Sequence, residues 1–290
     1  MSGCCVPAEG IPMRVNINQL KDMKQRGEKI AMLTTYDYTT ARIVDEAGIP
    51  LILVGDSLGM VVLGYDSTIP VTMDIMLHHT RAVARGVKNA MVIGDMPFMS
   101  YQVSTEQTLA HAAMFMQEGE AHAVKLEGGV TVASTVRRIV DCGIPVMGHI
   151  GLTPQSIYQL GGFKAQGKTL EAAKKLILDA LALEEAGAFA VVLETMPSEL
   201  SQLISRKLSI PTIGIGAGAG CDGQVQVISD MLGLFTAFVP KHVKQYVQLA
   251  DIMSSAIMQY AQEVKAGMFP TAKESITMDK SILAELEKAL

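Results

Sequence analysis

Residues 170–216 read LEAAKKLILDALALEEAGAFAVVLETMPSELSQLISRKLSIPTIGIG, and this stretch decides the fold. The Ala- and Leu-rich segment at 170–186 is typical of a helix, and the short apolar run at 190–195 is typical of a buried strand. The alternation then repeats, with a helical pattern at 199–207 and a second apolar run at 211–216. Successive helix-then-strand units indicate βα repeats around a parallel sheet.

The same rhythm continues outward along the chain. Further helical patterns lie at 73–85 and 105–118. Eight apolar runs are expected to form strands, at residues 30–37, 51–57, 90–96, 123–127, 145–150, 190–195, 211–216 and 233–240. Eight strands with intervening helices predict an α/β protein with a closed (β/α)8 barrel, a fold that commonly needs about 250 residues.

Further segments are expected outside the barrel. The pattern at residues 16–26 predicts a helix that covers the bottom of the barrel, and residues 279–290 also show helical spacing of apolar side chains. We therefore expect a single barrel domain over residues 1–290, with a flexible N-terminal tail at 1–14 and a C-terminal helical extension at 276–290. Either terminal helix offers a contact for an oligomer.

The composition excludes several classes of protein. Hydrophobic residues make up 49% of the chain and charged residues 18%, which is typical of a globular protein with a large core. A formal net charge of −5 without a cluster of Lys and Arg argues against nucleic acid as a partner. No apolar stretch approaches about 18 residues, so we expect no membrane partner. Small-molecule substrates are the expected partners.

The cysteines indicate a reducing compartment. Cys4, Cys5, Cys142 and Cys221 have neither the number nor the spacing of a disulfide framework or a zinc site. The N-terminus also lacks the basic region and apolar run of a secretion signal. We therefore expect a cytoplasmic protein.

Polar side chains end five successive predicted strands. In a barrel of this kind the carboxyl ends of the strands meet at one mouth, where catalysis takes place. The polar residues at these ends are Asp56, Ser57, Asp95, Lys125, Glu127, His149 and Glu194. We expect them to form one site.

The carboxylates in this set predict a metal site. Lys125 and Glu127 are two residues apart, so a strand places both side chains on the same face. Buried carboxylates that converge repel one another unless a divalent cation with a preference for oxygen binds them, and Mg²⁺ is the simplest such ion. The alternative is that each acid caps the following helix or pairs with a surface cation, which repetition on successive strands disfavours.

Two further features have two interpretations each. His149, in the segment GHIGLTP, is either a structural histidine or an active-site residue. The Gly-rich segment at 214–218 either brings backbone amides to an anion or allows close packing of a loop.

A series of motifs runs from about residue 29 to residue 270. In order they are TTYDYTTA, LVGDSLGMVVLGYDST, GDMPFMSY, VKLEGG, GHIGLTPQS, GGFKAQGK, LALEEAGAFAVVLE and IGIGAGAGCDGQVQV. Their order and combination resemble the ketopantoate hydroxymethyltransferase family, which are barrels of the phosphoenolpyruvate/pyruvate superfamily. The resemblance implies transfer of a hydroxymethyl group from 5,10-methylenetetrahydrofolate to 3-methyl-2-oxobutanoate, giving 2-dehydropantoate for the synthesis of pantothenate and coenzyme A.

The resemblance also implies roles for individual residues. A Mg²⁺ site would be formed by Asp56, Asp95 and Glu127, the last either directly or through water. Substrate contacts would come from Asp56, Ser57, Asp95, Lys125 and His149. Glu194 would be the catalytic base that removes the C3 proton of the substrate. The family commonly forms large homo-oligomers, so a homo-oligomer is expected, with a homodecamer as one form.

The sequence departs from the family pattern near the last two strands. Gln226 and Ser229 stand where the family usually has an apolar residue and a His, and His242 stands where a Phe is usual. These departures leave the acidic residues intact and put the folate contacts in question. Two other functions remain open: another Mg²⁺-dependent 2-oxo-acid lyase or mutase of the same superfamily, and a catalytically silent barrel.

Overall fold

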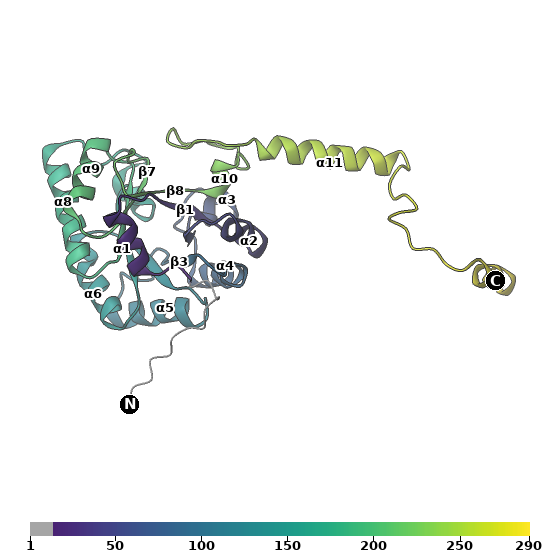
Figure 1. The fold of residues 1–290 in the computed structure, drawn as a ribbon, viewed down its shortest axis with the longest axis horizontal. Helices are drawn as coiled ribbons and strands as arrows, with labels where there is room; N and C mark the ends of the chain where they lie inside the picture. Colours follow the sequence, from purple (N-terminus) through teal and green to yellow (C-terminus); the bar gives the residue numbers. More distant parts are fainter. Residues whose placement is uncertain (1–13) are drawn as a thin grey trace, which may run out of the picture.

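The computed structural model describes residues 14–290 and contains a closed barrel of eight parallel strands, hydrogen-bonded to one another in chain order (Figure 1). The predicted (β/α)8 barrel is therefore confirmed. Pairing of β8 with β1 closes the barrel. The strands are β1 (Ile30–Thr34), β2 (Leu51–Val54), β3 (Met91–Asp95), β4 (Ala123–Glu127), β5 (Val146–Gly151), β6 (Ala190–Glu194), β7 (Thr212–Ile215) and β8 (Gly223–Gln226).

Helices surround the barrel, and the four predicted between strands are confirmed as α4, α5, α8 and α9. The flexible tail expected at 1–14, with Cys4 and Cys5, lies outside the described residues except for residue 14. The helices are α1 (Ile17–Gln25), α2 (Tyr38–Glu46), α3 (Leu58–Val61), α4 (Met73–Gly86), α5 (Thr105–Gln117), α6 (Ala133–Asp141), α7 (Ile157–Leu160), α8 (Leu170–Glu185), α9 (Ser198–Lys207), α10 (Ile228–Met231), α11 (Leu249–Lys265) and α12 (Lys280–Ala289).

The prediction for the eighth strand is wrong. Residues 233–240 form a loop after α10, whereas β8 lies earlier in the chain, at Gly223–Gln226. The sequence of β8 hides it, because Gln alternates with Gly and Val and no apolar run results. Gly223 is needed there for close approach, since a Cβ would lie 2.3 Å from the backbone oxygen of Ile30 on β1.

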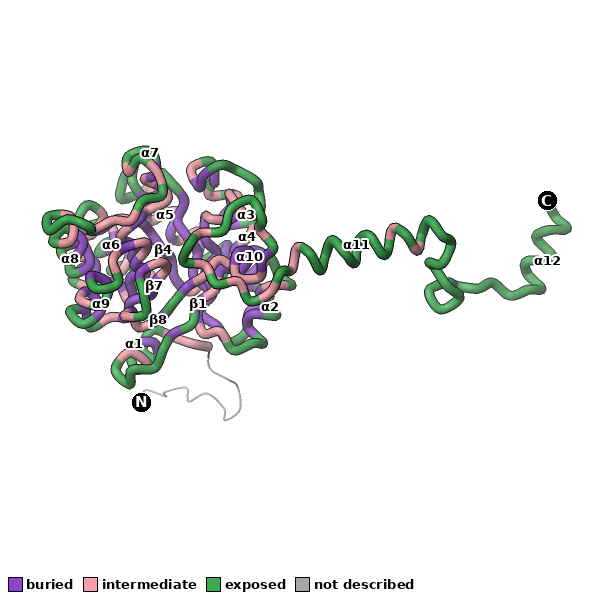
Figure 2. The backbone as a smooth tube through the Cα atoms, turned by 90° about the horizontal axis from the view of Figure 1, so that it is seen from above, coloured by how far each residue is buried: buried purple, intermediate pink, exposed green. Residues whose placement is uncertain are grey.

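Alternation along the strands separates two apolar cores. Side chains that point into the barrel form one cluster, which includes Met32 and Ile93. Side chains that point outward pack against the helices in a second cluster, which includes Val124 and Leu126 on β4. The tube in Figure 2 shows the barrel strands as the buried centre of the molecule. Lys125 therefore points inward on β4, as the spacing predicted.

Helix α1 closes one end of the barrel, as predicted for residues 16–26. Asn16 caps it: its side chain accepts hydrogen bonds from the backbone of Asn18 and Gln19, and the Gln19 side chain accepts one from the Asn16 backbone. Leu20 is the only fully buried residue of this helix, at 0% exposure, and it packs into the inner cluster against the barrel strands. The barrel is therefore plugged at its amino-terminal end.

The packing of β3 against α5 supplies a test of the fold. A Cβ on Gly94 would lie 2.3 Å from Cδ1 of Phe115, whose ring is fully buried. We expect Gly94→Ala to lower the free energy of unfolding by about 1–3 kcal/mol, because overpacking forces side chains and backbone to shift. Urea denaturation measures it. The double variant Gly94→Ala/Phe115→Leu is the control: it should cost less than the sum of the single changes, and strict additivity would contradict the predicted contact.

The C-terminal part of the chain extends away from the barrel. Figures 1 and 2 both show α11 and α12 reaching outward beyond α10, and neither helix contains a buried residue. The start of α11 is held to the barrel side, because Leu249 donates its backbone N–H to Leu232 at 2.9 Å. The helix predicted at 279–290 is confirmed as α12, whereas α11 was not predicted. Every helix within residues 14–290 is too short or too polar to span a membrane.

Candidate functional site

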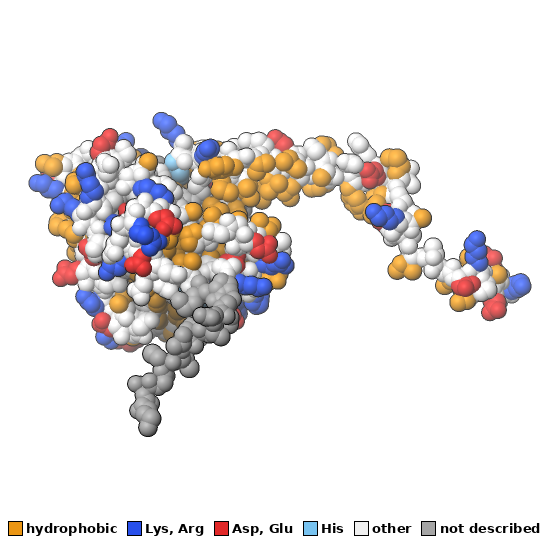
Figure 3. Space-filling model, in the orientation of Figure 1, with side chains coloured by type: hydrophobic (Ala, Val, Ile, Leu, Met, Phe, Trp, Pro, Cys, Tyr) orange, Lys and Arg blue, Asp and Glu red, His pale blue; other side chains and the backbone are white. Residues whose placement is uncertain are grey.

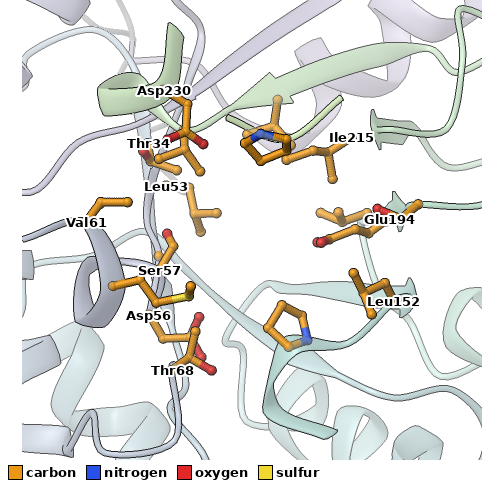
Figure 4. Close-up of a pocket in the computed structure, with 18 of the residues that line it drawn as sticks. Thr34, Leu53, Asp56, Ser57, Val61, Thr68, Leu152, Glu194, Ile215 and Asp230 are labelled. Atoms are coloured by element: carbon orange, nitrogen blue, oxygen red, sulfur yellow. The ribbon is translucent and has the colours of Figure 1, made fainter. Parts of the chain in front are cut away.

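The mouth of the barrel collects the polar residues that end the predicted strands. Asp95, Lys125 and Glu127 point inward from β3 and β4 because they continue the inward alternation of those strands. His149 on β5 and Glu194 at the end of β6 follow the same rule. Asp56 and Ser57 lie in the turn between β2 and α3. Figure 4 shows Asp56 and Ser57 on one wall of a cavity and Glu194 on the opposite wall.

Lys125 is buried among these acids. Its Nζ lies 2.8 Å from Oδ1 of Asp95, and both side chains are almost fully enclosed. The other carboxylate oxygen of Asp95 accepts a hydrogen bond from the backbone N–H of Asp56 at 3.2 Å. The ammonium group of Lys125 therefore pairs with Asp95, and the charge of Asp56 also acts on it.

His149 links two further acids. Its Nε2 lies 3.1 Å from Oε2 of Glu194, and its Nδ1 lies 3.4 Å from Oε1 of Glu127. The Nζ of Lys125 is also close, at 3.3 Å from Nδ1. The imidazole ring of His149 therefore contacts Lys125, Glu127 and Glu194.

Burial and mutual charge shift the pKa values of this group. Burial raises the pKa of Asp56 well above its usual range, and the charges of Asp95 and Glu127 raise it further. Burial also raises the pKa of Asp95, although the ammonium of Lys125 opposes the shift. Burial lowers the pKa of Lys125, but the surrounding carboxylates outweigh burial and the net shift is upward.

The pKa of His149 moves in the same direction as that of Lys125. Burial lowers it, and so does the charge of Lys125, but close contacts with Glu127 and Glu194 outweigh both and raise the pKa to about 9. At neutral pH the imidazole is therefore protonated, and it faces Glu194 as a cation.

Gln155 holds two of the acids in place, and the sequence analysis assigned it no role. Its side-chain Nε2 donates to Oδ2 of Asp56 at 2.9 Å, and its backbone N–H donates to Oε2 of Glu127 at 3.0 Å. Tyr101 donates its hydroxyl to the Gln155 side-chain oxygen at 2.7 Å. Both residues belong to quoted motifs, GLTPQS and GDMPFMSY, and this membership was the only sign of them in the sequence.

Ser57 has a partner that the sequence analysis also missed. The hydroxyl groups of Tyr36 and Ser57 lie 3.0 Å apart. Tyr36 is buried, and burial raises the pKa of its hydroxyl. The hydroxyl of Ser57 is therefore held at the cavity wall by a neutral neighbour.

The structural alternatives for the acids do not hold. None of Asp56, Asp95 and Glu127 caps the helix that follows its own strand, although Glu127 accepts a hydrogen bond from the backbone N–H of Gln155 in a later turn. The cation that pairs with Asp95 is the buried Lys125 and not a surface residue. His149 likewise joins the acids instead of a separate structural network.

The donor set suits a hard divalent cation that keeps other ligands. Two buried carboxylate oxygens, Oδ1 of Asp95 and Oε1 of Glu127, have no hydrogen-bond partner in the described part of the chain, although cationic side chains are near. In residues 14–290 no three His, Cys, Asp or Glu side chains are by themselves arranged to hold a metal ion. Mg²⁺ usually binds through one or two carboxylates together with water and substrate oxygens, so these residues fit such an ion.

The acids open into a cavity of about 440 Å³. Asp56, Ser57, Asp95, Lys125 and Glu194 line it at the polar end. Its other walls are mostly apolar and are formed by residues from β7, β8 and the loop after α10. Cavities of about 300–1,000 Å³ commonly hold a ligand of drug size, so this one has room for more than a five-carbon acid.

The residues that depart from the family pattern lie at or beside this cavity. His242 lines it, and burial lowers the pKa of that imidazole, although the charge of Glu194 opposes the shift. Ser229 is buried and Gln226 is half-buried, and both lie next in the chain to residues that line the cavity or its wall. In the Gly-rich segment, a Cβ on Gly218 would lie 2.5 Å from Cβ of Ser198, which supports close packing there.

Comparisons with known proteins agree on one family. The family model described as ketopantoate hydroxymethyltransferase matches residues 14–272. A relative from Dehalococcoides mccartyi, named 3-methyl-2-oxobutanoate hydroxymethyltransferase, is 68% identical over 278 residues, or 96% of this chain and 99% of that protein. A protein of the same name from Chloroflexus aurantiacus is 58% identical over 272 residues, or 94% and 96% of the two chains.

A solved structure supports the fold. The crystal structure of phosphonopyruvate hydrolase superimposes with a TM-score of 0.59 and covers 96% of both chains at 12% identity. At that identity the likeness concerns the barrel and not the activity. The family model and the relatives, by contrast, match most of the chain, and the range matched by the family model includes the mouth. The chain belongs to the ketopantoate hydroxymethyltransferase family.

Proposed function

We propose that this protein transfers a hydroxymethyl group from 5,10-methylenetetrahydrofolate to 3-methyl-2-oxobutanoate and so produces 2-dehydropantoate for pantothenate synthesis. The observation that carries this proposal is the mouth itself, where Lys125 is buried beside Asp95 and His149 contacts Glu194. Relatives that are 58–68% identical bear the name of this activity, which supports it.

The cationic and hydroxyl groups of the mouth would bind the 2-oxo acid. Lys125 carries its charge at the deep end of the cavity and would pair with the substrate carboxylate. Ser57, held by Tyr36, would donate a hydrogen bond to the same carboxylate. The small apolar side chain of the substrate would then face the apolar part of the cavity.

We assign the metal to the carboxylates beside Lys125. Asp56 and Asp95 would hold Mg²⁺, with Glu127 as a further ligand, directly or through water. The bound ion would polarise the 2-oxo group and so make the C3 proton more acidic. Nearby negative charges raise the pKa of Asp56 and of Asp95. The positive charge of the ion would offset this repulsion among Asp56, Asp95 and Glu127.

Glu194 would be the base, because it faces the cavity from the wall opposite Ser57 (Figure 4). It would take the C3 proton of the bound acid, and the cationic His149 at 3.1 Å would orient its carboxylate. The C3 carbon would form the new bond to the one-carbon unit. Water would supply the hydroxyl oxygen, and tetrahydrofolate would leave.

The decisive experiment is a product assay. Incubation of the purified protein with Mg²⁺, 3-methyl-2-oxobutanoate and 5,10-methylenetetrahydrofolate should give 2-dehydropantoate and tetrahydrofolate in equal amounts. Chelation of the metal with EDTA should stop the reaction, and added Mg²⁺ should restore it. A folded protein that forms no product under these conditions would exclude the proposal.

Another Mg²⁺-dependent 2-oxo-acid lyase or mutase is the second candidate, since solved structures with this barrel include a phosphoenolpyruvate phosphomutase and a 2,3-dimethylmalate lyase. A panel of 2-oxo acids and 2-hydroxy diacids without folate separates the two functions. Turnover of any of them without a one-carbon donor would favour the alternative. A silent barrel would bind the 2-oxo acid without exchanging its C3 proton.

The contacts of Gln155 predict that it positions the metal ligands. Replacing Gln155 with Met keeps its length but removes the donor to Asp56. We expect the Mg²⁺ concentration for half-maximal activity to rise about 10–100-fold, which is the usual cost of losing a residue that orients a metal ligand. A Mg²⁺ titration of activity measures it. Gln166→Met, in an exposed loop hydrogen bond, is the control, and equal titrations for both variants would contradict the role.

We also propose that the protein is a homo-oligomer whose arm, α11, packs on a second copy. Met253, Ile257, Tyr260 and Val264 recur at helical spacing on α11 and are all exposed. Figure 3 shows hydrophobic side chains gathered along this helix. The ring of Tyr260 meets that of Phe269 edge-on at 5.7 Å, but no residue of this helix, which is about 25 Å long, is buried by the described part of the chain.

Light scattering tests the oligomer. We expect the molar mass in solution to be a multiple of 31.0 kDa, ten copies being the form that the family resemblance suggests. The variant Ile257→Glu should lower that mass, because a charge in an apolar interface opposes association. Lys265→Glu, a charge change at the end of the same helix, is the control. A parent protein with the mass of one chain would refute the proposal.

A cytoplasmic location remains a prediction from the sequence. The free thiol of Cys142 is exposed, which suits a reducing compartment. Cell fractionation would test it.

A further inference from the structure

Asp230 is an acid of the cavity that the proposed chemistry leaves unused. It lies in α10, lines the cavity and is only 7% exposed. Within residues 14–290 its carboxylate has no hydrogen bond and no ion pair. Buried carboxylates usually have such partners, so an unpaired one at a cavity wall indicates that a ligand supplies the donor.

The surroundings of Asp230 exclude the residues of the mouth as its partner. Its charge acts on the hydroxyl of Tyr36, but that hydroxyl already lies 3.0 Å from Ser57. Burial raises the pKa of Asp230 to about 6, and no neighbouring donor lowers it. An N–H donor from a ligand would therefore offset the free-energy cost of burying the Asp230 carboxylate without a hydrogen bond.

Asp230 lies away from the end of the cavity where the 2-oxo acid is proposed to bind. Figure 4 shows its carboxylate beside Thr34 at one end of the cavity, with Asp56 at the far end and Glu194 across from both. The wall near Asp230 is apolar and includes Val227, on the same segment of chain, and Phe235 and Phe238 from the following loop. A flat apolar ring with N–H groups on one edge matches this end of the cavity, where the carboxylate of Asp230 lies beside apolar side chains.

We propose that Asp230 binds the one-carbon donor by accepting hydrogen bonds from the amino and ring N–H groups of its pteridine. This inference rests on the proposed function. A 2-amino-4-oxopteridine presents two adjacent donors on one edge, and a carboxylate can accept both at once, as it does from a guanidinium group. The donor would thus enter the same cavity as the 2-oxo acid, from the end opposite the metal-binding acids.

The test compares the two substrates in the full-length protein. Asp230→Asn keeps the shape of the side chain but removes its charge and one acceptor. We expect the KM for 5,10-methylenetetrahydrofolate to rise about 10–100-fold, the usual loss for hydrogen bonds to a charged group. The KM for 3-methyl-2-oxobutanoate should change less than about threefold, because this substrate is proposed to bind near Lys125 and Ser57, at the other end of the cavity. Asp141→Asn, an exposed acid at the end of α6, is the control for charge alone.

A ligand variant tests the same contact in the unmodified protein. Tetrahydrofolate should bind at least about tenfold more tightly than its 2-desamino-2-methyl analogue, which lacks the amino donor. That preference should disappear in Asp230→Asn. Equal affinities of the parent protein for both ligands, or an unchanged folate KM in the variant, would overturn the inference.

Failure of the inference and failure of the proposed function give different results. If the proposed function is wrong, the parent protein makes no 2-dehydropantoate. If only the inference is wrong, the parent makes the product and Asp230→Asn keeps the parent's folate KM. If the variant is misfolded, exchange of the C3 proton in D₂O is lost as well, and the analogue comparison in the parent then decides.

Discussion

Replacing Glu194 with Gln is expected to slow exchange of the C3 proton of 3-methyl-2-oxobutanoate by about 10²–10⁴-fold, the usual contribution of a general base. The variant keeps the shape of the side chain and its contact with His149 but removes the group that accepts the proton. Binding of Mg²⁺ and of the 2-oxo acid should persist. Proton NMR in D₂O, with Mg²⁺ and without folate, measures the exchange.

The control for this experiment lies close by in the chain. Glu199 is an exposed acid in the first turn of α9, so Glu199→Gln makes the same chemical change outside the cavity. Its exchange rate should match that of the parent. If Glu194→Gln also exchanges at the parental rate, then the base is another residue.

Replacing Asp56 with Asn is expected to raise the Mg²⁺ concentration for half-maximal activity by about 10–100-fold or more. Asp56 is buried and receives the hydrogen bond from Gln155, so the amide keeps the packing while it removes a charge that the ion requires. Asp95→Asn should act in the same direction. Activity titrated against Mg²⁺ measures both.

Thermal unfolding gives a second, independent result for Asp56→Asn. Because the fold raises the pKa of Asp56, ionisation of that acid at neutral pH destabilises the metal-free protein, and stability falls as the pH rises through its ionisation range. Without Mg²⁺ the variant should therefore have a Tm equal to or above that of the parent. The rise in Tm that Mg²⁺ gives the parent should be lost. The control Asp141→Asn should show the same rise in Tm with Mg²⁺ as the parent. If Asp56→Asn shows that rise too, Asp56 is not a metal ligand.

Much of the fold was predictable because most barrel strands are buried on both faces. The run that contains β6 reads AVVLET, and its apolar side chains serve the inner and the outer core at once. Strand β8 has Gln at alternate positions and therefore no continuous apolar run, so the eighth strand was predicted at the wrong place in the chain. Helix α11 was also missed, although Met253, Ile257, Tyr260 and Val264 recur there at helical spacing.

The acids of the mouth were predictable from their position at strand ends, whereas the residues that hydrogen-bond to them were not. Asp95 and Glu127 each end an apolar strand, and the geometry of a barrel brings strand ends together whatever the loops do. Gln155 reaches Asp56 across 99 positions of sequence, through a loop whose path no periodicity describes. Asp230 follows Ser229, which departs from the family pattern, but no sequence pattern marked Asp230 itself, and its lack of a partner among the described residues is visible only in three dimensions.

The plug formed by Leu20 has a consequence for kinetics. Since α1 seals the amino-terminal end of the barrel and apolar side chains fill the interior below the acids, the mouth described here is the way in and out for both reactants. In the arrangement proposed above, the small acid would sit deeper than the pteridine, so a folate already in place would obstruct it. We therefore expect a compulsory order, in which the 2-oxo acid binds before the folate and tetrahydrofolate departs before 2-dehydropantoate.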